Sequence, residues 1–357
     1  MNKGFEINEV GINFQLNSIK NLKIAHISDL HNSFFGQSNI DLAAKINEFE
    51  PDIIAFSGDM IHHNPITPVP FIELLRCITV KCPMYMCLGN HEIRYKRLNR
   101  DGYDEIMSQA ASLGVRLLDD EHERININGT DIDVYGLATA ASGYGSSVKS
   151  ITKRIGRCDS SVFSIVLAHS PAWFDSLAEW GADLVLSGHV HGGIIKLPVL
   201  GGLLSPECRI LPKYDSGLFE YNNSSKMYLS SGLGGALDSL RYKNPHELAL
   251  LYVNCSSGPR EKVRKRVASD IKISLKILLT FIMILTIIFS CIPMSLGYAN
   301  RGIVVNLILS IFGIVSIYPP KFIVNSRIFA MKELLFILRI AVIIAYLIST
   351  IILIIPR

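Results

Sequence analysis

Aspartate, histidine and asparagine residues recur in five short clusters, and each cluster follows an apolar run of the kind that forms a buried strand. The clusters are Asp29-Leu30-His31, Gly58-Asp59, Gly89-Asn90-His91-Glu92, His169 and Gly188-His189-Val190-His191. Carboxylate, imidazole and amide groups are ligands for divalent cations. Strands that share a sheet can bring such clusters to one place, so the pattern predicts hydrolytic chemistry at a binuclear metal centre.

Two cations held about 3.5–4 Å apart need a ligand that both of them share, usually a carboxylate. Asp59 is the predicted bridge, because Gly58 allows the chain to turn sharply after the apolar run 53–56. The other predicted ligands are two pairs of residues spaced two apart and two single side chains: Asp29 and His31, His189 and His191, Asn90, and His169.

The charge of such a centre indicates what it would bind. Two divalent cations, the carboxylates of Asp29 and Asp59, and one hydroxide leave a net charge of roughly +1. That charge favours an anionic phosphate ester and stabilises the negative charge that builds up during attack. Metal coordination lowers the pKa of water toward neutrality, so a metal-bound hydroxide is the predicted nucleophile.

The chain up to about residue 260 predicts alternating strands and helices. Predicted strands cover 22–28, 51–57, 84–88, 162–168, 183–186, 217–221, 226–230 and 247–253. Predicted helices cover 40–49, 71–80 and 103–113, and another opens at Ser170-Pro171. Asn128-Gly129 lies between two alternating runs, which predicts a β-hairpin. An α/β domain follows from this alternation.

The remainder of the chain is almost continuously apolar. It contains three apolar segments, at about 277–296, 302–320 and 334–355, and each is close to the roughly 20 residues that cross a bilayer. A basic stretch precedes them, with Lys and Arg concentrated in 261–266. We therefore predict a domain over 1–258, a basic juxtamembrane linker over 259–276 and a transmembrane region of about three helices over 277–357.

The basic residues around these segments predict how they are oriented. The basic linker and the second loop, which contains Lys321, Arg327 and Lys332, are expected on the cytoplasmic side. The protein is thus predicted to be a multi-pass membrane protein with a cytoplasmic catalytic domain. The first twenty residues contain no apolar stretch that would act as a signal peptide. A net charge of +4 is too small to predict nucleic-acid binding.

In this order, the five clusters resemble the motif blocks of calcineurin-like metallophosphoesterases over roughly residues 20–255. Further segments resemble the bacterial branch that contains the YkuE and YaeI phosphoesterases: Ser28-Asp29-Leu30-His31, Gly192-Gly193 followed by Leu197-Pro198, Leu211-Pro212-Lys213-Tyr214 and Ser231-Gly232-Leu233-Gly234. The resemblance implies a four-layer α/β/β/α sandwich. Relatives in this branch usually carry an amino-terminal export signal or anchor, whereas this chain has its apolar segments at the carboxyl end.

The resemblance also implies roles for individual residues. One cation would be held by Asp29, His31, Asp59 and His191. The other would be held by Asp59, Asn90, His169 and His189. His91 would be the catalytic residue near the leaving-group oxygen, either as a general acid or as an electrostatic stabiliser. The two divalent cations are expected to be Mn by resemblance, while the donor set also suits Fe or Zn.

Other polar residues leave alternatives open. Arg94, Arg209, Lys213 and Tyr214 would either clamp a phosphate or headgroup or be solvated loop residues. His62 and His63 follow Asp59 in a Pro-rich loop and are predicted to be surface residues, although they could line the mouth of the site. His26, inside the first predicted strand of the domain, is expected in the core, and His122 and His246 have no supporting neighbours.

These observations predict a membrane-anchored phosphoesterase that hydrolyses a phosphomonoester or phosphodiester, which the membrane segments suggest is lipid-linked. The alternative is a membrane sensor or scaffold that uses the same fold for binding rather than turnover. A transport protein is a third reading, but the apolar segments offer almost no polar positions for a translocation path.

Overall fold

The computed structural model of the 357-residue chain describes residues 4–15, 19–138, 147–193, 196–197, 201–202, 205, 212–222, 224–235, 241 and 243–263. Nearly all of them belong to one compact unit, which comprises Met1–Pro206 and Tyr214–Arg266. Within these described ranges the unit contains two six-stranded sheets and a short two-stranded hairpin.

The first sheet contains the strands that precede three of the five clusters. Its strands are β1 (Glu6–Ile12), β2 (Leu22–Ile27), β3 (Ile53–Phe56), β4 (Met84–Met86), β5 (Val115–Leu117) and β14 (Glu247–Val253). Their spatial order is β1-β14-β2-β3-β4-β5. Because β2 to β5 run parallel, their carboxyl ends meet at one edge of the sheet, whereas β14 runs antiparallel to β2.

The second sheet contains the strands that precede the other two clusters. Its strands are β6 (Glu121–Ile127), β7 (Thr130–Leu137), β8 (Phe163–Ala168), β9 (Leu184–Ser187), β12 (Gly217–Tyr221) and β13 (Ser225–Leu229). Their order is β12-β13-β9-β8-β7-β6, and β7, β8, β9 and β13 run parallel. The separate hairpin pairs β10 (Lys196–Leu197) with β11 (Gly201–Gly202).

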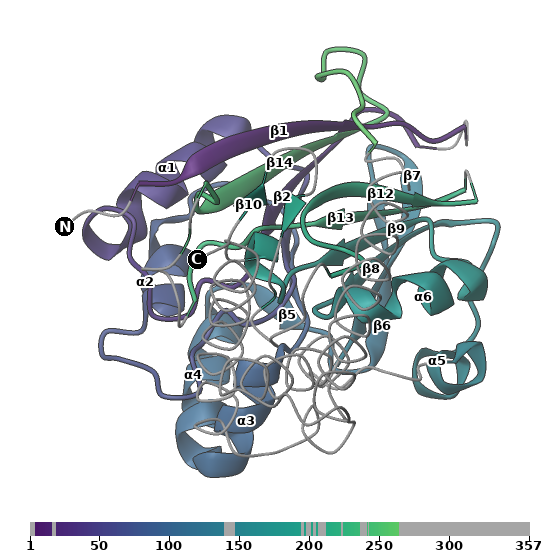
Figure 1. The fold of residues 1–357 in the computed structure, drawn as a ribbon. Helices are drawn as coiled ribbons and strands as arrows, with labels where there is room; N and C mark the ends of the chain where they lie inside the picture. The colour runs from purple at the N-terminus through teal and green to yellow at the C-terminus, as the bar shows by residue number, and fades with distance from the viewer. Residues whose placement is uncertain are drawn as a thin grey trace, which may run out of the picture. The chain divides into compact units, whose positions relative to one another are not determined.

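Helices cover the outer face of each sheet. They are α1 (Ile40–Phe49), α2 (Pro70–Cys77), α3 (Asn90–Leu98), α4 (Arg100–Ser112), α5 (Val148–Ile155) and α6 (Phe174–Trp180). α1, α2 and α4 lie beside the first sheet, and α5 and α6 lie beside the second (Figure 1). Buried side chains of α1, α2 and α4 pack on β2, β3 and β4, and those of α5 and α6 pack on β8, β9 and β13.

A third apolar cluster fills the space between the two sheets. Ile24 and Ile53 from the first sheet and Ile165 and Leu184 from the second are almost completely buried in it. The layers therefore follow the order helix, sheet, sheet, helix. This arrangement agrees with the α/β/β/α sandwich that the resemblance implies, and burial on both faces explains why β3 and β8 are continuously apolar.

Every strand and helix predicted within the described ranges is present, with bounds that differ by a few residues. β1, β5, α3, α5 and the hairpin of β10 and β11 have no counterpart among the elements predicted from the sequence. None of the helices in the described ranges is long and apolar enough to cross a membrane. The predicted segments 277–296, 302–320 and 334–355, and the linker from residue 264 onward, lie outside those ranges.

Candidate metal centre

The five clusters predicted from the sequence lie together where the two sheets face each other. Asp29, Asp59 and His91 follow β2, β3 and β4, while His169 and His189 follow β8 and β9. Backbone hydrogen bonds join neighbouring strand ends: the Asp29 N–H donates to the Gly58 carbonyl and the His31 N–H to the Asp59 carbonyl, each at 3.1 Å. The parallel order of the strands therefore brings the clusters to one edge.

Most of the predicted ligands have an unusual backbone conformation. Asp29, His31, Asp59, His189 and His191 all have positive φ values, between 49° and 73°. Residues with a Cβ atom rarely adopt this left-handed region, and such strain tends to accumulate at functional sites. Gly58, with φ 93°, completes the turn before Asp59 as the sequence predicts. These sharp turns direct successive side chains into one space instead of to opposite faces of a strand.

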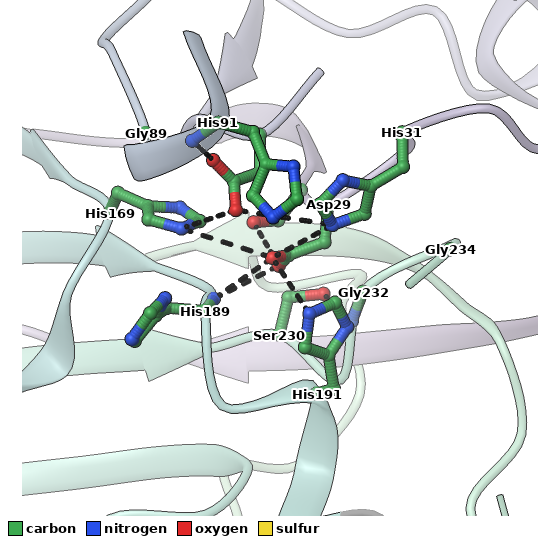
Figure 2. Close-up of polar contacts among 12 residues, drawn as sticks. Asp29, His31, Gly89, His91, His169, His189, His191, Ser230, Gly232 and Gly234 are labelled. Atoms are coloured by element: carbon green, nitrogen blue, oxygen red, sulfur yellow. Dashed lines mark hydrogen bonds and ion pairs between the residues drawn. The ribbon is translucent and has the colours of Figure 1, made fainter. Parts of the chain in front are cut away.

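Three histidines surround the carboxylate of Asp29, which is completely buried (Figure 2). The Asp29 Oδ1 atom lies 3.5 Å from His191 Nε2 and 4.0 Å from the Nε2 atoms of both His31 and His169. Its other oxygen, Oδ2, accepts hydrogen bonds from the Ser28 hydroxyl at 2.7 Å and from the His189 backbone N–H at 3.0 Å. These bonds hold Asp29 with Oδ1 directed at the imidazole rings.

Asp59 lies between two sets of imidazole groups. Its Oδ2 atom is 3.1 Å from His169 Nε2 and 3.9 Å from His31 Nε2, and its Oδ1 atom accepts the His91 backbone N–H at 2.7 Å. Burial alone would raise the pKa of the Asp59 carboxyl, but His169 and His91 hold that pKa well below its usual range. Asp59 is therefore an anion that contacts both halves of the cluster, as a bridging ligand must.

The side chains form sets in which one ligand atom from each residue lies within 4.8 Å of the others. Asp29, His31 and His191 make one set, and Asp59, His169 and His189 make another. Several ligand atoms here are buried with no hydrogen-bond partner: both ring nitrogens of His31 and Asn90 Oδ1. Buried polar atoms normally have partners. An oxygen and nitrogen donor set of this kind fits divalent cations.

Two of these imidazoles have the protonation state that metal binding needs. Burial lowers the pKa of His31 and of His191 to about 4 against the opposing effect of nearby carboxylates, so both rings are neutral near pH 7. His169 differs: burial lowers its pKa, but the Asp59 carboxylate outweighs burial and raises it to about 10. A cation between Asp59 and His169 would take the place of that proton.

The sequence model of the family described as calcineurin-like phosphoesterase matches residues 22–193. These residues form a calcineurin-like phosphoesterase domain. The match contains all the clusters described above and ends directly after the last one. The two-sheet α/β fold agrees with this assignment.

Three curated relatives are similar to this chain. An uncharacterized metallophosphoesterase of Helicobacter pylori is 29% identical over 236 residues, 65% of this chain and 60% of its own length. The metallophosphoesterase YkuE of Bacillus subtilis is 27% identical, covering 64% of this chain and 77% of its own. The UDP-2,3-diacylglucosamine pyrophosphatase LpxG of Chlamydia trachomatis is 24% identical, covering 64% and 83%. The chain thus spans less than two thirds of the length of the Helicobacter relative.

Glu92, which belongs to one of the predicted clusters but received no role, organises the loops of the phosphoesterase domain. Its side chain is completely buried and accepts backbone N–H groups from Asp59 at 2.9 Å, Ile61 at 2.7 Å and Gly89 at 2.8 Å. Burial and the nearby Asp59 raise the pKa of Glu92 to about 7. Glu92 thus fixes the turn that carries Asp59 against the start of α3.

His91, the predicted catalytic residue, contacts the two histidines that the sequence analysis placed on the surface. The His63 N–H donates to His91 Nδ1 at 3.3 Å, and the two Nδ1 atoms are 3.0 Å apart. The other ring nitrogen of His91 points toward Asp29 and His31 (Figure 2). His62 and His63 are both half-buried, and the contacts of His63 with His91 agree with the alternative that these two histidines line the mouth of the site.

Arg241 lies at the site, although no pattern in the sequence predicts it there. Its guanidinium donates to the carbonyl oxygens of Gly232 at 3.2 Å and Gly234 at 2.7 Å, and lies 3.2 Å from His191 Nδ1. Asn244 donates to the His191 carbonyl at 2.5 Å. Neither residue lies in a cluster of ligand types, and no local pattern in the sequence indicates that they reach His191.

The other polar residues considered from the sequence have different surroundings in the fold. Tyr214 donates to Asp175 in α6 at 2.6 Å, so it is bonded within the helical layer of the second sheet. His26 is buried in β2 and bonds Ser57, which confirms its predicted core position. His122 stacks on Tyr135. Arg94 lies in α3 near His63, and Arg209 lies outside the described residues.

Proposed function

We propose that this chain is a membrane-anchored, binuclear metal-dependent phosphoesterase. The observation that carries the proposal is the arrangement around Asp59, whose carboxylate contacts one ring from each set of imidazoles. Buried ligand atoms without partners on His31 and Asn90 support it, because cations would satisfy them.

The predicted ligands divide between two cation positions with Asp59 shared. Asp29, His31 and His191 would complete one position, and Asn90, His169 and His189 would complete the other. The two cations, for which Mn is the first choice and Fe or Zn the alternatives, would supply an activated water nucleophile and neutralise phosphate charge. Asp59 would fix their separation, and Glu92 would hold Asp59 through its backbone.

His91 is proposed as the catalytic residue that acts on the leaving-group oxygen. Its Nδ1 atom accepts the His63 N–H, so in the neutral ring the proton lies on Nε2. Nε2 is the nitrogen on the side of Asp29 and His31 (Figure 2). A proton there can be donated to a leaving group or hydrogen-bonded to a phosphoryl oxygen.

The substrate is proposed to be a phosphate monoester or diester, including lipid-linked compounds. A net charge of roughly +1 at the centre favours anionic esters. The Chlamydia relative is named for a diacylglucosamine nucleotide, which is lipid-linked. The apolar segments 277–296, 302–320 and 334–355, with the basic linker before them, would anchor the domain at the cytoplasmic face of a membrane. Nucleic acid is not an expected partner.

The decisive experiment compares the wild-type chain with Asp59→Asn. We would load each with Mn²⁺ and measure hydrolysis of an aryl phosphodiester, an aryl phosphomonoester and a UDP-linked diacylglucosamine. Asp59→Asn is expected to lose at least 100-fold in rate on every substrate that the wild type hydrolyses, because the shared anionic ligand is gone.

Asp101→Asn is the matched control, since Asp101 is exposed in the first turn of α4 and contributes to none of the ligand sets. It should keep the wild-type rate. Hydrolysis by Asp59→Asn at the wild-type rate would refute the proposal. The same screen separates monoesterase from diesterase activity, and the wild-type rates with Mn²⁺, Fe²⁺ and Zn²⁺ identify the productive cation.

A further inference from the structure

Three imidazole rings meet beside the proposed two-cation centre, where the His91 ring centroid lies 4.5 Å from that of His31. His62 and His63 lie in the loop after β3, and their ring centroids are each 4.8 Å from that of His91. One nitrogen from each of the three lies within 4.8 Å of the others. All three side chains are half-buried, so the cluster is accessible to ions in solution.

The nitrogens are spaced as ligands of one small cation are. In a tetrahedral zinc site with Zn–N bonds of about 2.0–2.1 Å, neighbouring nitrogens are roughly 3.3 Å apart. The Nδ1 atoms of His63 and His91 are 3.0 Å apart. With His62 Nδ1–H donating to the Asn64 carbonyl oxygen at 3.1 Å, the lone pair of the neutral ring is on Nε2, which is the atom that His62 offers to a ligand.

We propose that His62, His63 and His91 form a third cation site, which binds Zn²⁺. A set of imidazole nitrogens without a carboxylate suits Zn²⁺, whereas Mn²⁺, Mg²⁺ and Ca²⁺ favour oxygen ligands. Partial exposure leaves a fourth coordination position for water. The positive charge of Arg94, which lies near His63, opposes a cation here, so this site is weaker than the two-cation centre.

Zinc at this position would act on the orientation of His91. The cation would bind Nδ1, the nitrogen that otherwise accepts the His63 N–H, and the ring proton would stay on Nε2. The ring would then be attached to the loop of His62 and His63. The third site rests on the geometry of these three residues and does not require the proposed hydrolytic function.

The test counts bound zinc. Full-length protein in detergent would be dialysed against increasing free Zn²⁺, and bound metal would be measured by mass spectrometry. Wild type is expected to bind one Zn²⁺ more per chain than the double variant His62→Gln/His63→Gln. This additional Zn²⁺ should bind only at the highest free Zn²⁺ concentrations, because the third site is weaker than the two-cation centre. His122→Gln, on the exposed surface of β6, should bind as many ions as the wild type.

Equal zinc counts in the wild type and the double variant would overturn the proposal. With Mn²⁺ the two proteins should bind the same number of ions, and an additional Mn²⁺ in the wild type would overturn the assignment to a nitrogen-preferring cation. Separate His63→Gln and His62→Gln variants, each expected to lose one Zn²⁺, give the same answer if the double variant does not fold. The rate of Asp59→Asn tests the hydrolytic function, and the zinc count of the His62 and His63 variants tests the third site. Failure of either proposal is therefore distinguishable from failure of the other.

Discussion

The Nδ1 atom of His169 lies 2.9 Å from the carbonyl oxygen of Ser57. This contact joins the end of β8 in the second sheet to the end of β3 in the first. With Nδ1–H donating to the carbonyl, Nε2 faces Asp59 at 3.1 Å and is the ring atom that a cation would bind when it displaces the proton. A backbone partner that sets the tautomer of a ligand histidine is a common feature of metal sites.

Replacing His169 should therefore remove one cation and leave the other. His169→Ala is expected to bind one Mn²⁺ where the wild type binds two, since Asp29, His31, His191 and Asp59 are unchanged. Bound metal after dialysis, measured by mass spectrometry, checks this. His122→Ala, which changes an exposed imidazole, should retain both ions. Two ions in His169→Ala would show that this side chain is not a required ligand.

Gly58→Ala should be much more destabilising than Gly129→Ala, although both positions have left-handed backbones, with φ of 93° and 83°. A Cβ atom at Gly58 would lie 2.7 Å from Gly89 N and 2.9 Å from His169 Nδ1, whereas one at Gly129 meets nothing within 4 Å. We expect a loss of roughly 1 kcal/mol at Gly129 from backbone strain. At Gly58 we expect about 2–4 kcal/mol, because crowding adds to strain.

Urea denaturation followed by tryptophan fluorescence measures both variants. The two tryptophans, Trp173 and Trp180, both belong to the apolar cluster that α6 forms with the second sheet, so their emission reports unfolding of this domain. Similar losses of stability in the two variants would contradict the close approach of Gly58 to His169.

Glu92→Gln should weaken both stability and metal binding. The Glu92 carboxylate accepts three buried N–H groups through two oxygens, and a glutamine offers only one oxygen. Leaving one buried N–H without an acceptor costs roughly 1–3 kcal/mol. Because the Asp59 turn loses a support, Mn²⁺ affinity should fall about 10- to 100-fold, as for other partners of metal ligands.

Calorimetric titration of Mn²⁺ measures this loss of affinity, with the exposed Glu105→Gln as control. Wild-type affinity in Glu92→Gln would show that the turn holds its shape without this acid.

His26 should make the stability of the domain depend on pH. Burial lowers its pKa to about 4, against the opposing effects of Glu247 and Asp29, while its value in the unfolded chain is near 6.5. Above pH 6.5 the ring is neutral in both states, and below that pH only the unfolded chain takes up the proton. Stability is therefore lost as pH falls from 6.5 to 4, by about 3 kcal/mol.

The comparison that isolates this effect uses His26→Gln, which keeps a polar group beside Ser57. The difference in unfolding free energy between wild type and variant should change by about 3 kcal/mol between pH 7 and pH 4, with the wild type losing more. A constant difference across that range would mean that the His26 ring can take up its proton inside the fold.

The elements predicted correctly from the sequence are those whose pattern is local. β3 and β8 are short apolar runs that end at polar turns, and the Asn128-Gly129 hairpin has a two-residue signature. β1 was not predicted, because Glu6–Ile12 is half polar and owes its conformation to parallel pairing with β14, the last strand of the domain. The first turn of α3 was not predicted, because its residues were interpreted only as ligands.

The difference between local patterns and long-range contacts also applies to the candidate site. Asp29, Asp59 and the clustered histidines could be predicted, because each follows a strand and the strands run parallel. The contact of His63 with His91 spans 28 residues and depends on how the loop after β3 folds over α3. Arg241 reaches His191 across 50 residues. Such contacts are properties of the assembled fold and leave no periodic signal in the chain.

The position of β14 has a consequence for synthesis of the chain. β2, which leads to Asp29, pairs on one side with β3, the next strand to be made, and on the other side with β14, the last strand in the part of the chain that the structure describes. One edge of β2 therefore stays unpaired on the ribosome until β14 has emerged. Unpaired strand edges invite association with other chains. Slowing translation before β14 should therefore lower the yield of folded protein.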